Sequence, residues 1–317
     1  MADGNRLATR VLGKTGLEVT DIGLGCWAFG GSSFRGGLAT GWAGSDIRKS
    51  LETIEGARQR GITFYDTADA YGRGKSEVLL GMGLGEHKDA AVIGSKVGNS
   101  LAAPGQFYDE PYIRGALDAS LTRMERSWLD IYLVHDPKIE KLTDELFDLM
   151  KTLKAEGKVK YWGVSLSSVE EGQRSIEGGA DIIQIEYSIL KQDVADALLP
   201  LAREKGVGVI ARVPLATGWL SGKFDENTVF PEDDHRSWKY PPEVIRDFAA
   251  KVKRLDFLLD EAESLAEAAL RFVLSNPDVG TVIPGAKNLH QLEENLKASG
   301  KGLSESALKQ IAEVVKN

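Results

Sequence analysis

The sequence predicts an α/β protein that folds as a closed (β/α)8 TIM barrel with an N-terminal β-hairpin, and three observations indicate this. Short apolar runs of strand type alternate with amphipathic helical runs, which is typical of a parallel sheet. The strand runs cover 21–27, 63–68, 91–97, 130–136, 161–167, 181–187, 207–215 and 280–284. No linker or change of composition divides the 317 residues, so these units fit one barrel domain over 1–317 better than an open sheet.

The remaining elements follow in chain order. Residues 8–12 and 17–19 are expected to pair as the hairpin, because Gly13-Lys14-Thr15-Gly16 between them forms a glycine-bearing turn. Helices are expected at 46–60, 76–84, 110–121, 144–156, 169–177, 195–205 and 261–276, and after the last strand at 289–298. Ser45-Asp46 and Gly61 are ordinary start and stop signals for the first of them. The long segments 30–44 and 224–242 follow strands, so we expect both at the carboxyl rim of the barrel.

Composition argues against several classes of function. The formal net charge is −8, and basic residues do not gather in one stretch, so neither nucleic acid nor an anionic membrane is expected as a partner. No apolar run approaches the roughly 18 residues that span a bilayer. The single cysteine, Cys26, cannot form an internal disulfide, and residues 1–5 lack a secretory pattern, so a cytoplasmic location is expected. Four scattered histidines predict no metal site.

Three ionisable residues stand at the carboxyl ends of successive strands. They are Asp66, Lys96 and His135, and Tyr71 follows Asp66 by five residues, so all four are expected at one rim. Lys96 ends an apolar run and must bury most of its stem, for which Asp66 is the obvious partner. The ammonium should lower the pKa of the Tyr71 phenol from about 10 and make it a proton donor near neutral pH.

This group also admits plainer interpretations. The pair of Asp66 and Lys96 could instead be only a structural ion pair, and a lone histidine is more often a core residue than a catalyst. The shared rim favours a functional role for His135, in orienting a carbonyl group or sharing the proton of Tyr71. A set of this kind suggests carbonyl reduction.

Several segments could hold a dinucleotide. The run 23–28 has the spacing GxGxxA, but a long glycine-rich segment follows it instead of a helix, so we reject that motif and expect Trp27 to line a pocket. Ser165 and Gln184, at the ends of adjacent strands, suit a carboxamide such as nicotinamide. The loop 214–223 suits a pyrophosphate, and Lys287 before the helix at 289–298 suits a 2′-phosphate. Each signal is weak alone, but together they are coherent.

From about residue 8 to 315 the chain resembles the aldo-keto reductase superfamily, in its bacterial and plant branch with longer chains. The motifs occur in the family's order and spacing. They are Phe64-Tyr65-Asp66-Thr67-Ala68-Asp69-Ala70-Tyr71-Gly72 with Ser76-Glu77, Gly94-Ser95-Lys96, Leu133-Val134-His135, Gly163-Val164-Ser165, Gln184-Ile185-Glu186-Tyr187, the loop 214–223, and Ile283-Pro284-Gly285-Ala286 with Glu294-Asn295.

The resemblance implies reduction of an aldehyde or ketone, or oxidation of the alcohol, with NADPH as cofactor and NADH as an alternative. Tyr71 would be the general acid, and Asp66, Lys96 and His135 would complete a catalytic tetrad. The substrate would lie against Trp27, Tyr71 and His135. The cofactor would be held by Ser165, Gln184, Pro214, Leu215, Thr217, Gly218, Leu220, Lys223, Gly285, Lys287, Gln291, Glu294 and Asn295. Tyr108 and the segment 238–240 are further candidates for the substrate pocket.

The sequence departs from the family pattern at three places. Leu166 stands where many members have Asn, Arg212 or Val213 stands where an aromatic residue often stacks on nicotinamide, and Gln291 stands where Arg is common. Two other functions remain open. One is a cofactor-binding sensor of the potassium-channel β-subunit kind, and the other is an aldolase that uses Lys96 as a Schiff base. Nothing in the sequence indicates an oligomeric state or a physiological substrate.

Overall fold

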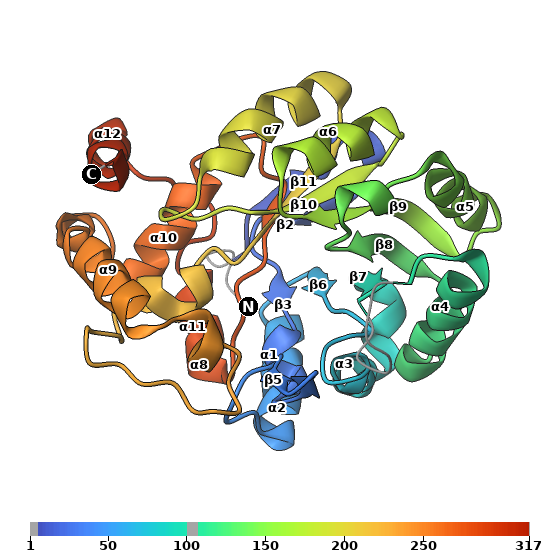
Figure 1. Cartoon of the computed structure of the whole chain (residues 1–317), viewed down its shortest axis with the longest axis horizontal. Coiled ribbons are helices and arrows are strands. Elements are labelled where there is room, and N and C mark those ends of the chain that lie inside the picture. The colour runs from blue at the N-terminus through green and yellow to red at the C-terminus, as the bar shows by residue number, and fades with distance from the viewer. Residues whose placement is uncertain (1–5, 100–106, 317) are drawn as a thin grey trace.

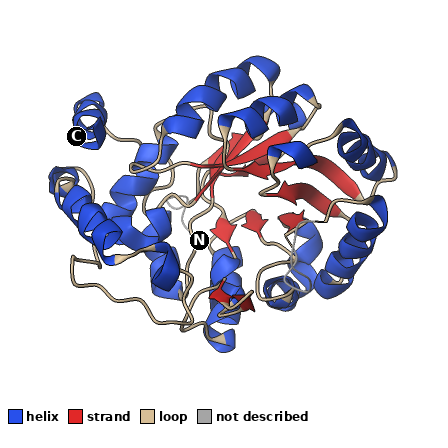
Figure 2. Cartoon of the chain, viewed as in Figure 1, coloured by secondary structure: helices blue, strands red, loops and turns tan. Residues whose placement is uncertain are grey.

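The structure is a computed structural model that describes residues 6–99 and 107–316. Its centre is an eight-stranded parallel sheet surrounded by helices (Figures 1 and 2). Along the sheet the strands are β3 (Leu24–Gly25), β6 (Phe64–Asp66), β7 (Val92–Val97), β8 (Leu129–His135), β9 (Val159–Leu166), β10 (Ile182–Glu186), β11 (Gly208–Arg212) and β12 (Thr281–Val282). Parallel bridges from Ile22 to Val282 and from Gly25 to Gly285 join the last strand to the first. The closed barrel is therefore confirmed.

The outer layer contains the helices that the sequence predicts. They are α2 (Ile47–Gln59), α3 (Lys75–Leu84), α4 (Glu110–Met124), α5 (Asp144–Ala155), α6 (Val169–Glu177), α7 (Asp193–Lys205), α10 (Leu265–Leu274) and α11 (Leu289–Leu296). Short polar side chains set several starts, since Asp46, Ser168 and Asn288 each accept a backbone N–H bond at the first turn of α2, α6 and α11. Apolar faces of these helices pack on the strands and form one continuous core.

The N-terminal hairpin plugs one end of the barrel. Strands β1 (Thr9–Val11) and β2 (Glu18–Thr20) pair antiparallel around the short helix η1 (Gly13–Thr15). Leu12 and Val19 are fully buried in a second core formed with inward-facing strand residues such as Phe64 and Ile210. Gly13 is required at this contact, because a Cβ there would lie 2.4 Å from the amide nitrogen of Gly208.

The structure adds elements that the sequence analysis did not predict. They are α1 (Trp27–Gly30), the hairpin of β4 (Phe34–Arg35) and β5 (Leu38–Ala39), α8 (Arg236–Lys239), α9 (Pro242–Lys253), α12 (Glu305–Lys316), and the short helices η2 (Gly85–Ala90), η3 (Ile139–Lys141), η4 (Ala216–Ser221) and η5 (Asp256–Asp260). For α12 the signal was present, because Ala307, Ile311 and Val314 are buried at helical spacing. Among the others, β4, β5 and α8 lie inside the two long rim segments, and all but α9 have too few residues to show a period.

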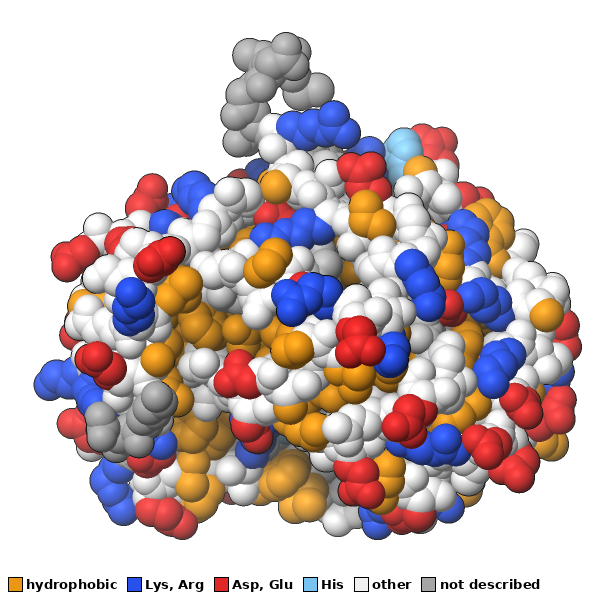
Figure 3. Space-filling model, turned by 90° about the horizontal axis from the view of Figure 1, so that it is seen from above, with side chains coloured by type: hydrophobic (Ala, Val, Ile, Leu, Met, Phe, Trp, Pro, Cys, Tyr) orange, Lys and Arg blue, Asp and Glu red, His pale blue; other side chains and the backbone are white. Residues whose placement is uncertain are grey.

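The surface and the helix lengths add two facts. Acidic and basic side chains are interspersed on the face shown in Figure 3, with apolar side chains in furrows between them. Within 6–99 and 107–316, no helix is both long and apolar enough to cross a membrane.

Candidate active site

A buried ion pair forms the floor of the site. Asp66 ends β6 and Lys96 lies near the end of the adjacent β7, and both are nearly inaccessible to solvent. Lys96 Nζ donates to Asp66 Oδ2 at 2.7 Å, to the carbonyl oxygen of Thr67 at 2.7 Å and to the hydroxyl of Tyr71 at 3.1 Å. An ammonium has three N–H donors, so these contacts satisfy the group completely. Asp66 and Tyr71 from one chain segment and Lys96 from another are thus brought together.

The protonation states in this group differ from the prediction in one respect. Burial favours a neutral amine, but Asp66 and Tyr71 outweigh it and raise the pKa of Lys96. Burial also raises the pKa of Tyr71, and the opposing charge of Lys96 does not overcome it. The predicted lowering of the Tyr71 pKa is therefore wrong, because burial disfavours the phenolate by more than the Lys96 ammonium stabilises it. At neutral pH Tyr71 carries its proton and Lys96 carries its charge.

Two rings flank Tyr71. His135, at the end of β8, meets it edge-on with ring centroids 5.8 Å apart, and Trp27 stacks on it at 5.9 Å. Burial, followed by the charges of Lys96 and Arg212, lowers the pKa of His135 well below its usual range, so the ring is neutral. Its Nδ1 atom is buried and has no hydrogen-bond partner among the described residues. Tyr108 donates to the carbonyl oxygen of His135 at 3.1 Å, so it supports the histidine from behind.

A second chain of hydrogen bonds connects the predicted nicotinamide residues to this floor. Ser165 Oγ donates to Gln184 Oε1 at 3.0 Å, and Gln184 Nε2 donates to Asp66 Oδ1 at 2.7 Å. The parallel register explains the contact, because Gln184 pairs with Ser165 across β10 and β9. Sequence analysis placed both residues at the rim but did not foresee that Gln184 would reach Asp66.

These residues open onto a cavity of about 610 Å³ at the carboxyl rim. Asp66, Tyr71, His135 and Trp27 line it, whereas Lys96 lies beneath. Of the predicted cofactor residues the lining includes Ser165, Gln184, Pro214, Leu215, Thr217, Gly218, Lys223, Gly285, Lys287, Gln291, Glu294 and Asn295. The described chain brings no three His, Cys, Asp or Glu residues together in a group that could hold a metal ion.

Some predicted lining residues lie elsewhere. Leu220 packs in the core, because positive φ angles at Ala216, Thr217 and Gly218 turn the η4 segment inward. Tyr240 is buried among aromatic rings around Trp219, so it belongs to the core and not to the pocket.

The lining also includes residues that sequence analysis missed or left unassigned. They are Arg35, Trp42, Asn99, Asp136, Arg212, Arg236 and Ser264. Most come from loops, where no periodic pattern marks them. A weak signal existed for Arg212, because it stands at a position where the family pattern expects an aromatic residue.

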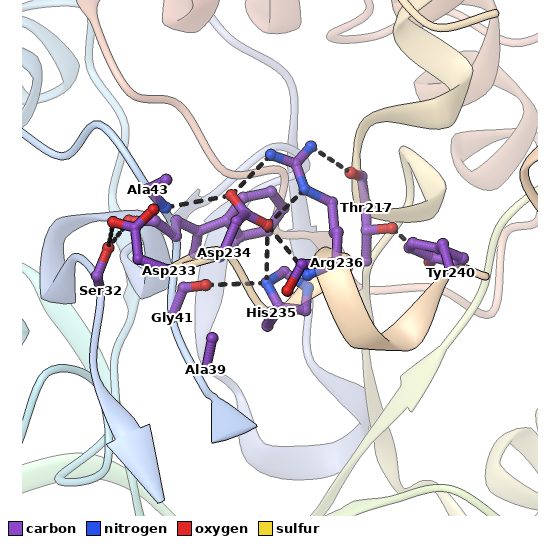
Figure 4. A network of polar contacts seen from close by, with 12 residues as sticks. Ser32, Ala39, Gly41, Ala43, Thr217, Asp233, Asp234, His235, Arg236 and Tyr240 are labelled. Carbon is purple, nitrogen blue, oxygen red and sulfur yellow. Dashed lines mark hydrogen bonds and ion pairs between the residues drawn. The ribbon is translucent and has the colours of Figure 1, made fainter. Parts of the chain in front are cut away.

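The two long rim segments are fastened to each other beside the cavity. We call the hydrogen bonds between residues 233–238 and residues 32–43 the clasp (Figure 4). Ser32 donates to Asp233 at 2.6 Å, and the Ala43 amide donates to Asp234 at 3.1 Å. The His235 amide and Nδ1 both donate to the Gly41 carbonyl oxygen, at 2.9 and 3.0 Å. Trp238 Nε1 donates to the Ala39 carbonyl oxygen at 2.7 Å. The prediction that both segments lie at the rim is confirmed.

An ion pair stiffens the clasp from within. Arg236 Nε donates to Asp234 Oδ1 at 2.7 Å, and the guanidinium lies over the rings of Trp42 and Phe230 at 4.7 and 4.5 Å from their centroids. Burial lowers the pKa of His235 to about 4, despite the hydrogen bond to Gly41 that opposes the shift. His235 is therefore neutral at pH 7 and donates through Nδ1.

Comparison with known proteins identifies this arrangement. The sequence model of the Aldo/keto reductase family matches residues 21–316. The chain belongs to this family. It is 30% identical over 316 residues to aldo-keto reductase YhdN of Bacillus subtilis, covering 96% of this chain and 93% of that protein. It is also 27% identical over 305 residues to a probable voltage-gated potassium channel subunit beta of Arabidopsis thaliana, covering 90% and 89%.

Solved structures of the family share the fold. The glycerol dehydrogenase AKR11B4 from Gluconobacter oxydans superposes with a TM-score of 0.82 at 26% identity, covering 97% of this chain and 94% of that one. The aldo-keto reductase AKR11C1 from Bacillus halodurans, in its holo form, gives a TM-score of 0.78 at 27% identity, covering 97% and 96%. The chain is thus an oxidoreductase-family barrel, and the family resemblance of the sequence is confirmed.

Proposed function

We propose that this aldo-keto reductase reduces aldehydes or ketones with NADPH, or oxidises the corresponding alcohols, and that Tyr71 is the general acid. One observation carries the proposal. Tyr71 lines the cavity, and its hydroxyl accepts a hydrogen bond from the buried, charged Lys96. We also propose that the chain performs this reaction as a single domain.

The residues divide the work as follows. Tyr71 is protonated at neutral pH, so its O–H is available to the oxygen of a carbonyl group in the cavity. When that proton leaves, the phenolate that remains lies 3.1 Å from the Lys96 ammonium, which stabilises it. Asp66 keeps Lys96 charged, and neutral His135 orients the carbonyl oxygen.

The cavity suits a nicotinamide dinucleotide. Bound there, the nicotinamide would supply the hydride for the carbonyl carbon, while Ser165 and Gln184 are placed to hold a carboxamide. Towards the other end, burial and the nearby charge of Arg236 lower the pKa of Lys287, since two cations share a partly dry space. A 2′-phosphate beside Lys287 would relieve this repulsion, and because NADH lacks that phosphate we expect NADPH to bind more tightly.

The test is a titration with NADPH and with NADH, monitored by fluorescence of the six Trp, followed by turnover of a simple aldehyde. We expect tighter binding of NADPH and oxidation of NADPH that depends on aldehyde. Absence of binding by both nucleotides would refute the proposal.

A second candidate is a cofactor-binding sensor, favoured by the similarity to plant potassium-channel β subunits. Tight NADPH binding without turnover on a broad panel of aldehydes and alcohols would support it. A Schiff-base aldolase is disfavoured, because Lys96 has a raised pKa and all three of its N–H donors are engaged. Borohydride trapping of a Lys96 adduct would revive that alternative.

A further inference from the structure

We propose that a second cavity binds the phosphate group of a small molecule through Arg73 and Lys75. This phosphate cavity has a volume of about 570 Å³ and is lined by the end of α1, the segment before α2 and the turn that leads into α3. Among the described residues, none lines both this cavity and the one that Tyr71 lines, the active-site cavity. The inference therefore does not rest on the proposed reductase function.

The two cations of the phosphate cavity have their charges available. Arg73 is exposed and Lys75 is half-buried, and within residues 6–99 and 107–316 neither side chain takes part in a hydrogen bond or an ion pair. Asp233 is the one acid of the described lining, and it accepts from Ser32 Oγ at 2.6 Å and pairs with neither cation (Figure 4). Two cations and one carboxylate leave the lining with a net positive charge, which attracts an anion into a concave site.

Neutral groups of the kind that bind phosphate lie beside Lys75. Gly31 marks the place, because a Cβ built there would lie 3.5 Å from Lys75 Nζ and 3.5 Å from Ser45 Oγ. The ammonium from α3 and the hydroxyl that precedes α2 therefore lie at the same wall of the cavity. Four of the lining residues are glycines, so the backbone is open to close approach by a ligand.

The turn that carries Arg73 has an unusual backbone. Gly72, Arg73 and Gly74 have φ angles of 61°, 56° and 87°, a left-handed conformation that glycine adopts readily and arginine does not. Close packing fixes the start of the turn, because a Cβ on Gly72 would lie 2.3 Å from the Gly30 carbonyl oxygen. A disfavoured conformation is thus kept where it places a cation in the lining, and such strain is typical of functional sites.

The donor set and the volume indicate a phosphate ester. A phosphate group offers three oxygens that can accept from a guanidinium and an ammonium together. The volume of about 570 Å³ lies within the range of small-molecule sites, so it leaves room for an organic group beside the phosphate. Three serines in the lining suit a hydroxylated organic group, such as a short polyol. Inorganic phosphate shares the charged part of this chemistry.

The probes are inorganic phosphate and glycerol 3-phosphate, each titrated into the full chain by isothermal titration calorimetry at low ionic strength. We expect one molecule per chain with a dissociation constant of about 1 mM or lower, and weaker binding as the salt concentration rises. Tighter binding of glycerol 3-phosphate would identify an ester as the ligand, and equal binding would identify the free ion. Absence of binding by both probes would overturn the inference.

Variants of the two cations locate the probe. Arg73→Gln and Lys75→Gln should each weaken phosphate binding about fivefold or more, because each removes one charge-assisted contact. Their melting temperatures should stay within about 2 °C of the parent, since neither side chain has a described partner to lose. Arg48→Gln, on the exposed face of α2, is the matched control and should leave phosphate binding unchanged. Full binding by the double variant of Arg73 and Lys75 would overturn the inference.

Lys287→Gln separates the phosphate cavity from the active-site cavity, which offers a cation of its own. It should leave phosphate binding within about twofold of the parent, because the two cavities have no described lining residue in common. Loss of binding in Lys287→Gln, with full binding in Arg73→Gln and Lys75→Gln, would overturn the inference, because phosphate would then lie in the active-site cavity.

Discussion

Two buried ion pairs lie near this cavity, and they are built in different ways. The Asp66–Lys96 pair joins adjacent strands, and the Asp234–Arg236 pair joins residues of one rim loop, although both have N–O distances of 2.7 Å. Sheet hydrogen bonds between β6 and β7 fix the position of the first pair. The second depends on loop contacts and on the aromatic rings around Arg236. The strands of the barrel thus fix the Asp66–Lys96 pair, whereas side-chain contacts hold the Asp234–Arg236 pair of the clasp. Local opening is therefore expected at the Asp234–Arg236 pair first.

The largest expected effect comes from removing the Tyr71 hydroxyl while the strand-borne pair, Asp66–Lys96, stays in place. Tyr71→Phe leaves Lys96 and Asp66 in place but removes the proton donor, so kcat should fall about 10²–10⁴-fold, the usual contribution of a general acid. The NADPH dissociation constant should stay within about threefold, since the hydroxyl contacts Lys96 and not the predicted cofactor residues. Steady-state kinetics and fluorescence titration measure the two quantities. Turnover near the parent rate would remove Tyr71 from its proposed role.

Breaking the strand-borne pair itself should damage stability. Lys96→Met leaves Asp66 buried without its cation, which should lower the free energy of unfolding by about 3–5 kcal/mol. The double variant Asp66→Asn with Lys96→Met removes both charges and should recover part of the loss. Urea unfolding followed by circular dichroism measures each protein. Equal stability of the Lys96→Met variant and the parent would contradict the account of a buried, coupled pair.

Removing the cation from the Asp234–Arg236 pair of the clasp should lower the free energy of unfolding by less. Arg236→Met leaves Asp234 with the Ala43 amide as a hydrogen-bond donor, so we expect a loss of about 1–3 kcal/mol in the free energy of unfolding. NADPH affinity should fall as well, because Arg236 lines the cavity, while kcat at saturating NADPH stays within a few-fold. A drop in kcat as large as that of Tyr71→Phe would contradict this expectation, because it would mean that the clasp is needed for the reaction step itself. Arg48→Gln again serves as the surface control.

The last expected effect is a pH dependence of the clasp. His235 is neutral in the fold with a pKa of about 4, whereas an exposed histidine titrates near 6.5, so the unfolded chain binds more protons between these values. Stability should therefore fall as pH decreases from about 6.5 towards 4, by at most about 1.4 kcal/mol per pH unit for this one group. His235→Asn keeps an N–H donor for Gly41 and should flatten this part of the profile. His135 titrates in both proteins, so the difference between their melting temperatures at pH 7.5 and pH 5 isolates His235.

The comparison also explains what the sequence could predict. Strands have a period and ends, so the rim positions of Asp66, Lys96 and His135 followed from the apolar runs before them. Arg35, Asn99 and Arg236 come from three separate segments at the rim, and no spacing in the sequence brings them together. The predicted direction of the Tyr71 pKa shift was wrong for a related reason. The neighbouring charge could be inferred from the sequence, but the extent of burial could not.

The same limit applies to backbone conformation. Leu220 belongs to a segment whose composition predicts a phosphate loop, and its inward turn depends on positive φ angles at Ala216 and Thr217, which non-glycine residues seldom adopt. Sequence patterns therefore located the loop correctly but not the direction of each side chain.

The hairpin at the amino end of the barrel affects how molecules enter and leave the cavity. Leu12 and Val19 are fully buried and fill that end of the barrel. The cavity above Asp66 is therefore closed on the hairpin side and opens at the carboxyl rim. Two molecules that lie one above the other in a blind hole cannot exchange places. We therefore expect that, of two molecules bound in this order, the one that enters second leaves first.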